Sequence, residues 1–210
     1  MMQKSWKLAM GCIAAVAIMA TNVRAQDEIA SNVVGYVKVA LEAGQLSLLA
    51  QPFDQVDGSA NTVNNVLGTQ VGIGTSVYVY DAEAGTYANA GRSALGWTAA
   101  LPLTRGYGFW INSPAAVEIL LMGQVPEEDS VMDVEAGLAL YGNPVPVEQT
   151  IADSGLNAAP MGTSINFWDG SGYVNVGKSA FGWPAGTSIG MAEGFWMIAP
   201  SAFQWTEPAP

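Results

Sequence analysis

The chain contains two diverged copies of one sequence unit, and this repeat limits the folds open to it more than any other feature. Residues 74–81 align with 162–169, residues 91–97 with 177–183, and residues 108–110 with 194–196. Shorter blocks beginning at Glu42 and Gln51 align with blocks beginning at Glu135 and Asn143. Because the blocks recur in the same order, the sequence predicts an internal duplication.

Each copy has the pattern of short strands separated by turns. Apolar residues alternate along residues 33–41, and further short apolar segments follow at 46–50, 77–80, 87–90, 108–112 and 117–122. The one helical turn that we expect covers residues 63–67, with Thr62 as its N-cap. The predicted fold is all-β, a tandem pair of small β-sandwich or barrel-like domains at residues 26–126 and 127–210.

The first 25 residues have the pattern of a signal peptide. Lys4 and Lys7 precede an apolar stretch of residues 8–20, and residues 23–25 resemble a cleavage site. The stretch is too short for a transmembrane helix. A lipoprotein modified at Cys12 is the alternative, although the apolar stretch continues beyond Cys12. We therefore expect export to the periplasm or out of the cell.

Charge restricts the partners of the mature chain. Loss of Lys4, Lys7 and Arg24 leaves four basic residues against 18 acidic ones, a net charge of −14. Such a chain repels phosphate backbones, so we expect no nucleic-acid partner. No stretch beyond the leader is apolar enough for a membrane-spanning helix. Protein partners, glycans and self-association remain open.

The residue types exclude most catalytic chemistry. The chain has no histidine, and its one cysteine, Cys12, lies in the leader. Imidazole bases, thiolate nucleophiles and the common zinc sites are therefore absent from the mature sequence. A glycoside hydrolase using only carboxylates is the remaining enzymatic alternative. Glu127, Glu128 and Asp129 are adjacent in a predicted linker, where a solvated role is expected. We expect no enzyme.

Four tryptophans at aligned positions are the candidate ligand-binding residues. Trp97 and Trp183 lie in matched loops, and Trp110 and Trp196 lie in matched strands. Exposed rings of this kind stack on sugars or partner surfaces. The alternative is that they pack in the core, with Phe109 and Ile111, or Phe195 and Met197, on the opposite strand face.

Asp81 and Asp169 recur at one position of the repeat, at the start of a hairpin loop. Carboxylates there commonly cap the turn. The alternative is that each forms part of a Ca²⁺ site with nearby carbonyl groups. Apart from this possible Ca²⁺ we expect no cofactor. The complete calcium-loop pattern is missing.

Two motifs carry a resemblance to known modules. Leu-x-Leu-x-(Gly/Ala)-(Asn/Gln)-Pro occupies residues 46–52 and 138–144, and Gly-Phe-Trp-x-x-x-Pro occupies residues 108–114 and 194–200. This succession resembles β-repeat modules in uncharacterised secreted proteins of Gram-negative bacteria. The resemblance implies export and β structure, and it transfers no activity.

These observations favour a non-catalytic exported protein with a structural or partner-binding role at the cell envelope or outside the cell. Open sheet edges and an aromatic face would be its means of binding. The second hypothesis is a carbohydrate-binding module that uses the tryptophans. The carboxylate-only hydrolase comes third.

Overall fold

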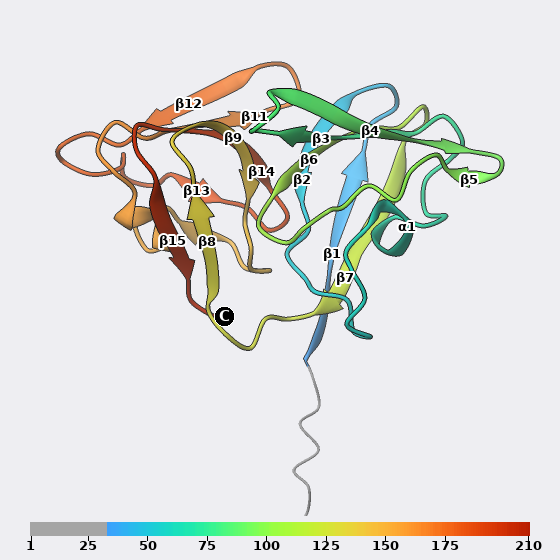
Figure 1. Cartoon of the computed structure of the whole chain (residues 1–210), viewed down its shortest axis with the longest axis horizontal. Helices are drawn as coiled ribbons and strands as arrows, with labels where there is room; N and C mark the ends of the chain where they lie inside the picture. The colour runs from blue at the N-terminus through green and yellow to red at the C-terminus, as the bar shows by residue number, and fades with distance from the viewer. Residues whose placement is uncertain (1–32) are drawn as a thin grey trace, which may run out of the picture. The chain divides into compact units, whose positions relative to one another are not determined.

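The computed structural model describes residues 33–210, which form one compact unit (Figure 1). The predicted signal peptide lies outside the described residues. We call residues 33–126 the first half and residues 127–210 the second half. Nearly all regular structure is β, as predicted. Within residues 33–210, no helix is long and apolar enough to cross a membrane.

The first half contains seven strands and one short helix. Its elements are β1 (Val34–Leu41), β2 (Leu46–Ala50), α1 (Val63–Val66), β3 (Ser76–Asp81), β4 (Thr86–Ser93), β5 (Gly96–Trp97), β6 (Gly108–Asn112) and β7 (Val117–Gln124). Helix α1 occupies the predicted position, and the Thr62 side chain accepts a hydrogen bond from the Asn65 N–H at 3.4 Å.

The second half contains eight strands and a short 3₁₀ helix. Its elements are β8 (Ser130–Val134), β9 (Gly137–Gly142), β10 (Gln149–Thr150), η1 (Gly155–Ala158), β11 (Ser164–Trp168), β12 (Tyr173–Gly177), β13 (Ser188–Ile189), β14 (Gly194–Ala199) and β15 (Phe203–Glu207).

The strands of the two halves pair in the same order. The main sheet of the first half runs β2-β6-β3-β4-β5, and that of the second half runs β9-β14-β11-β12. Each half adds a two-stranded sheet, β1-β7 in the first and β8-β15 in the second. All these pairs are antiparallel, and none of the sheets closes into a barrel. The sheets are therefore open, and no closed barrel occurs within residues 33–210.

Each half has its own apolar core, and a third cluster lies between the halves. In the first half, Phe109 and Ile111 of β6 pack with Ile119 and Leu121 of β7. The third group, which we call the central cluster, buries aligned residues from both halves. Its buried members are Leu48, Trp110, Leu140 and Trp196, and Tyr78, Tyr80 and Trp168 pack against them.

Aligned residues make reciprocal contacts across the boundary between the halves. The Ala50 N–H donates to the Ala192 carbonyl at 2.9 Å, and the Gly142 N–H donates to the Gly106 carbonyl at 3.0 Å. Ala50 aligns with Gly142, and Ala192 aligns with Gly106. The halves therefore face each other through the same surface, as in an isologous dimer. The boundary predicted at residues 126 and 127 stays a prediction.

The glycine of the repeated Gly-Phe-Trp motif has a structural reason at this boundary. A Cβ atom at Gly108 would lie 2.7 Å from the Tyr141 carbonyl oxygen, and one at Gly194 would lie 2.6 Å from that of Leu49. Both distances are too short for a side chain. Glycine at these two positions allows the opposite half's backbone to approach.

Candidate functional site

A groove lined by aromatic rings opens beside the central cluster. Its volume is about 590 Å³. Both halves contribute to it, and we call it the aromatic groove. It is lined by Leu46, Tyr78, Tyr87, Asn89, Trp110, Asn112, Trp168 and Tyr173.

Strand register brings the first-half residues to one face of the main sheet. Tyr78 on β3 lies beside Trp110 on β6 and beside Asn89 on β4. Residues directly opposite each other in paired strands point to the same side of the sheet. Phe109 and Ile111, the sequence neighbours of Trp110, point to the other side and fill the first core. The alternation predicted for β6 is therefore observed.

Edge-to-face contacts hold the rings of the second half in place. The centroid of Trp168 lies 5.4 Å from that of Trp110 and 5.1 Å from that of Tyr173. The Trp168 indole N–H donates to the Leu46 carbonyl at 2.9 Å. The Trp196 indole N–H donates to the Tyr173 hydroxyl at 3.2 Å. These contacts fix the walls of the aromatic groove, which reduces the entropy lost when a ligand binds.

The lining of the aromatic groove carries no charged side chain. Its polar groups are the amides of Asn89 and Asn112 and the tyrosine hydroxyls. Burial raises the pKa of Tyr87 from its ordinary value of 10.0, and a hydrogen bond from Trp110 opposes that rise. The hydroxyl therefore stays neutral at physiological pH. Such a site suits a neutral ligand with a flat apolar face and polar edges.

The two loop tryptophans lie outside the aromatic groove. Trp183 is buried in the second core, and its indole N–H donates to the Leu156 carbonyl at 3.0 Å. Trp97 packs against the first core, and its indole N–H donates to the Gly68 carbonyl at 3.0 Å. Both rings tie a loop to the body of their half. Trp183 therefore offers little free ring surface for a sugar, whereas Trp97 is only partly buried.

The two strand tryptophans lie in the central cluster, with exposed fractions of 6% for Trp110 and 8% for Trp196. Trp110 also forms part of the lining of the aromatic groove. Trp196 lies behind Tyr80, with ring centroids 4.8 Å apart. Of the four predicted tryptophans, only Trp110 therefore lines the groove.

Asp81 and Asp169 cap their hairpin turns. The Asp169 Oδ1 accepts hydrogen bonds from the backbone N–H groups of Ser171 and Gly172, both at 2.8 Å. These bonds lower the pKa of Asp169. The Asp81 Oδ1 accepts equivalent bonds from Glu83 and Ala84, both at 3.0 Å. Across residues 33–210, no group of three or more His, Cys, Asp or Glu side chains is placed to hold a metal ion.

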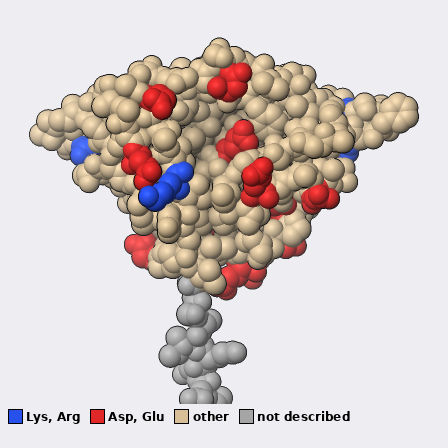
Figure 2. Space-filling model, turned by 180° about the vertical axis from the view of Figure 1, so that it is seen from behind, with Lys and Arg blue, Asp and Glu red and all other residues tan. Residues whose placement is uncertain are grey.

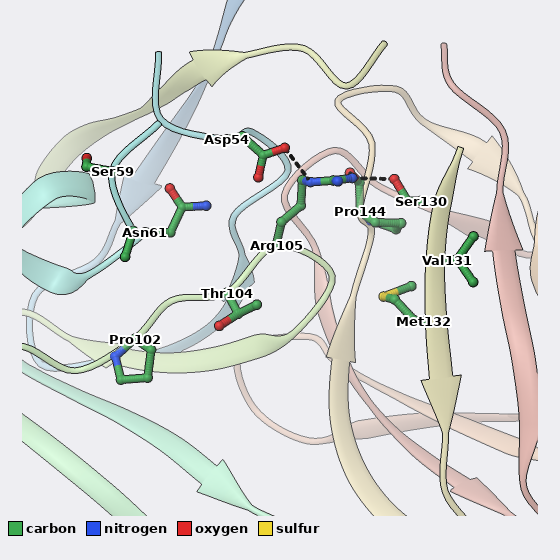
Figure 3. A pocket seen from close by; sticks show the side chains of 11 residues that line it. Asp54, Ser59, Asn61, Pro102, Thr104, Arg105, Ser130, Val131, Met132 and Pro144 are labelled. Carbon is green, nitrogen blue, oxygen red and sulfur yellow. Dashed lines mark hydrogen bonds and ion pairs between the residues drawn. The ribbon is translucent and has the colours of Figure 1, made fainter. Parts of the chain in front are cut away.

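A second groove, of about 370 Å³, lies near the linker between the halves (Figure 3). Arg105 crosses it. The Arg105 Nε lies 3.0 Å from Asp54 Oδ2, and its Nη1 donates to the Ser130 hydroxyl and to the Pro144 carbonyl. Because these partners already occupy the guanidinium, Arg105 joins the two halves and is not a free anion-binding group.

Acidic side chains are spread over the surface, and basic ones are few (Figure 2). Lys38 pairs with Glu118 at 2.9 Å. Lys178 donates to the Asn157 and Ala159 carbonyls. Two of the four basic residues within residues 33–210 thus have intramolecular partners on the surface, and Arg105 has them in the second groove. An anionic ligand would find little to bind.

Glu193 lies at the boundary of the halves, and its carboxyl group should make the stability of the fold depend on pH. Burial raises its pKa above the ordinary value of 4.5, although the Gly190 N–H donates to its carboxylate at 2.7 Å. The unfolded chain therefore loses this proton at lower pH than the folded chain. The Glu193 carboxylate therefore destabilises the folded state once the pH rises above 4.5, the ordinary pKa of this side chain. At pH 7 we expect Glu193→Gln to have a larger free energy of unfolding than the wild type. At pH 4 we expect this difference to be smaller. Urea unfolding at the two pH values measures this, and an equal effect at both would contradict it.

Sequence reasoning missed most of the groove residues, namely Tyr78, Tyr87, Asn89, Asn112, Trp168 and Tyr173. A signal was present, because Tyr87 and Asn89 share one face of a period-2 strand, and Tyr173 repeats the position of Tyr87. The contact of Trp168 with Trp110 had no such signal, since it depends on how the halves dock.

Comparison with protein-family models, with curated proteins and with solved structures found no match to this chain.

Proposed function

We propose that this chain is an exported, non-catalytic binding protein that holds a neutral carbohydrate in the aromatic groove. One observation carries the proposal: five aromatic rings and two asparagine amides line a single open groove. A pyranose ring has an apolar C–H face and polar hydroxyl edges. The rings would stack on that face, and the amides would bond the hydroxyls.

The charge distribution supports a neutral glycan over an anionic one. The lining of the groove contains no cation to pair with a carboxylate or sulfate. The mature chain has a net charge of −14, which repels an anionic polymer at low salt. An uncharged polysaccharide needs no cation in the groove and is not repelled by the negative charge of the chain.

The lining also supports binding in preference to hydrolysis. Carboxylate-based glycosidases place two carboxyl groups on opposite sides of the bond that they cleave. No Asp or Glu lines the aromatic groove. Glu127, Glu128 and Asp129 lie instead at the linker, in a different depression that includes Asp54 and Arg105.

The predicted leader supports a site of action in the periplasm or outside the cell. The common strand order of the halves supports an origin by duplication of one unit. In this proposal the groove exists only in the pair, because each unit contributes rings to it.

Replacing Tyr173 with alanine is expected to weaken glycan binding by at least about tenfold, as for a hot-spot aromatic residue. Tyr173 is half exposed and forms one wall of the groove. The measurement is retardation of the mature protein in native gels containing neutral polysaccharides such as β-glucan, xylan or mannan. Tyr36→Ala is the control, because Tyr36 is 65% exposed on β1, outside the groove. Equal retardation of both variants would contradict the proposal.

A further inference from the structure

Strand β12 is an open edge of the main sheet in the second half. Within the described part of the chain it pairs with β11 and with no other strand. In Figure 1 it is drawn in orange at the margin of the molecule. An unpaired edge presents a row of backbone N–H and C=O groups that another strand can pair with.

The pairing pattern shows which residues of β12 present those groups. The Lys178 N–H donates to the Thr163 carbonyl at 2.8 Å, next to the register pair of Gly177 and Ser164. Hydrogen-bonded and non-bonded pairs alternate in an antiparallel ladder. The backbone groups of Tyr173, Asn175 and Gly177 therefore point away from β11.

The edge has none of the features that usually prevent edge-to-edge pairing. Exposed edges are commonly protected by lysine, proline or a bulge. The five residues of β12, Tyr-Val-Asn-Val-Gly, include no charge and no proline. They stand in a mature chain that has 18 acidic residues.

The equivalent edge of the first half, on β4, is capped at its Gly91 end. On β4, the Gly91 N–H donates to the Thr98 hydroxyl at 2.9 Å, and the Thr98 N–H donates to the Gly91 carbonyl at 3.0 Å. The residue aligned with Thr98 is Pro184, which has no N–H to donate. Gly177, which aligns with Gly91, therefore lacks the corresponding cap.

We propose that β12 pairs antiparallel with β12 of a second copy of this chain, in a register centred on Asn175. In this register the outward backbone groups of Tyr173, Asn175 and Gly177 meet those of Gly177, Asn175 and Tyr173 in the other copy. Each Tyr173 lies across from Gly177, so its side chain meets no bulky neighbour in the other copy. Val174 faces Val176 on the other side of the sheet.

The ends of the strand bring no like charges together in this arrangement. Lys178 follows β12 and lies opposite the uncharged Gly172 of the other copy. Its Nζ donates to the Asn157 and Ala159 carbonyls of its own chain. The two four-stranded sheets then form one continuous sheet.

Pairing about a twofold axis keeps the same sheet face on the same side in both copies. Tyr173 lines the aromatic groove, so both grooves open on one side of the joined sheet. If the proposed function holds, a single polysaccharide chain can occupy both grooves, and the dimer gains affinity through avidity.

The test is the molar mass of the mature chain in solution, measured by light scattering after size exclusion. We expect twice the mass of one chain for the wild type. Asn175→Pro removes an outward N–H without breaking the ladder to β11, so it is expected to give the monomer mass. Asn89→Pro makes the same change on β4, away from the proposed β12 pairing, and there the dimer mass is expected to persist.

A second variant decides the matter if Asn175→Pro fails to fold, which circular dichroism reports. Asn175→Lys places two like charges opposite each other at the centre of the interface. The dimer should dissociate at low salt and re-form at high salt. A monomeric wild type at about 0.1 mM, a concentration at which pairs with Kd in the micromolar range associate, would overturn the proposal. So would a dimer unaffected by both Asn175 variants. Because mass is read without sugar, this result is independent of whether the groove binds a glycan.

Discussion

Replacing Trp196 with alanine is expected to lower the free energy of unfolding by about 3–5 kcal/mol, the usual cost of removing a large buried aromatic side chain. Trp196 is 8% exposed, and it packs in the central cluster with Leu48 and Leu140. Its ring also contacts Tyr80 of the other half. The loss should therefore affect both halves together. Urea unfolding followed by circular dichroism measures it.

Leu95→Ala is the matched control, because the Leu95 side chain is fully exposed at a loop tip and has no burial to lose. We expect this variant to unfold at the same urea concentration as the wild type. If Trp196→Ala cost no more than Leu95→Ala, the central cluster would contribute nothing to stability, and the account of the boundary would be wrong.

Replacing Gly142 with alanine is expected to destabilise the protein by about 1–3 kcal/mol, the usual cost of overpacking. A methyl group at Gly142 would overlap the methyl group of Ala50, its aligned residue in the other half. Only one of the two positions has room for a side chain. The double variant Ala50→Gly with Gly142→Ala exchanges them, and we expect it to recover most of the loss.

The wild type, the two single variants and the double variant form a thermodynamic cycle. Their unfolding free energies give the coupling energy between positions 50 and 142. Gly172→Ala serves as a control for adding a methyl group, because a Cβ atom there would meet nothing within 4 Å. Additive effects of Ala50→Gly and Gly142→Ala would contradict the close approach of the halves. A large favourable coupling would support it.

Local features of the fold were predictable from the sequence. Alternation placed β1 and β6, and turn residues placed the hairpin between β3 and β4. The Thr62 cap and helix α1 followed from one short motif. These features depend on neighbours in the chain, so the pattern of residues is sufficient to find them.

The docking of the halves was not predictable in the same way. The sequence left both an exposed platform and a core position open for Trp110 and Trp196. Their burial depends on reciprocal contacts between segments that lie far apart in the chain, such as that of Ala50 with Ala192. The aromatic groove results from that docking. For this reason the sequence predicted Trp110 as a binding residue but did not predict Trp168 or Tyr173.

The role of the two aspartates as turn caps could be predicted from the residues of their own hairpin loops. Asp81 and Asp169 each bond two N–H groups of their own turn, the arrangement usual for a carboxylate at the start of a hairpin loop. The calcium alternative would need further oxygen ligands around the same carboxylates. The turn alone accounts for both residues.

Calorimetric titration with sugars decides whether the aromatic groove is a site for neutral carbohydrate. The mature protein would be titrated with neutral oligosaccharides of glucose, xylose and mannose, beside a variant that lacks both the Tyr87 and Tyr173 rings. We expect saturable heat with at least one of these sugars and its loss in the variant. Absence of saturable heat with all of them, or equal heat in the variant, would contradict it.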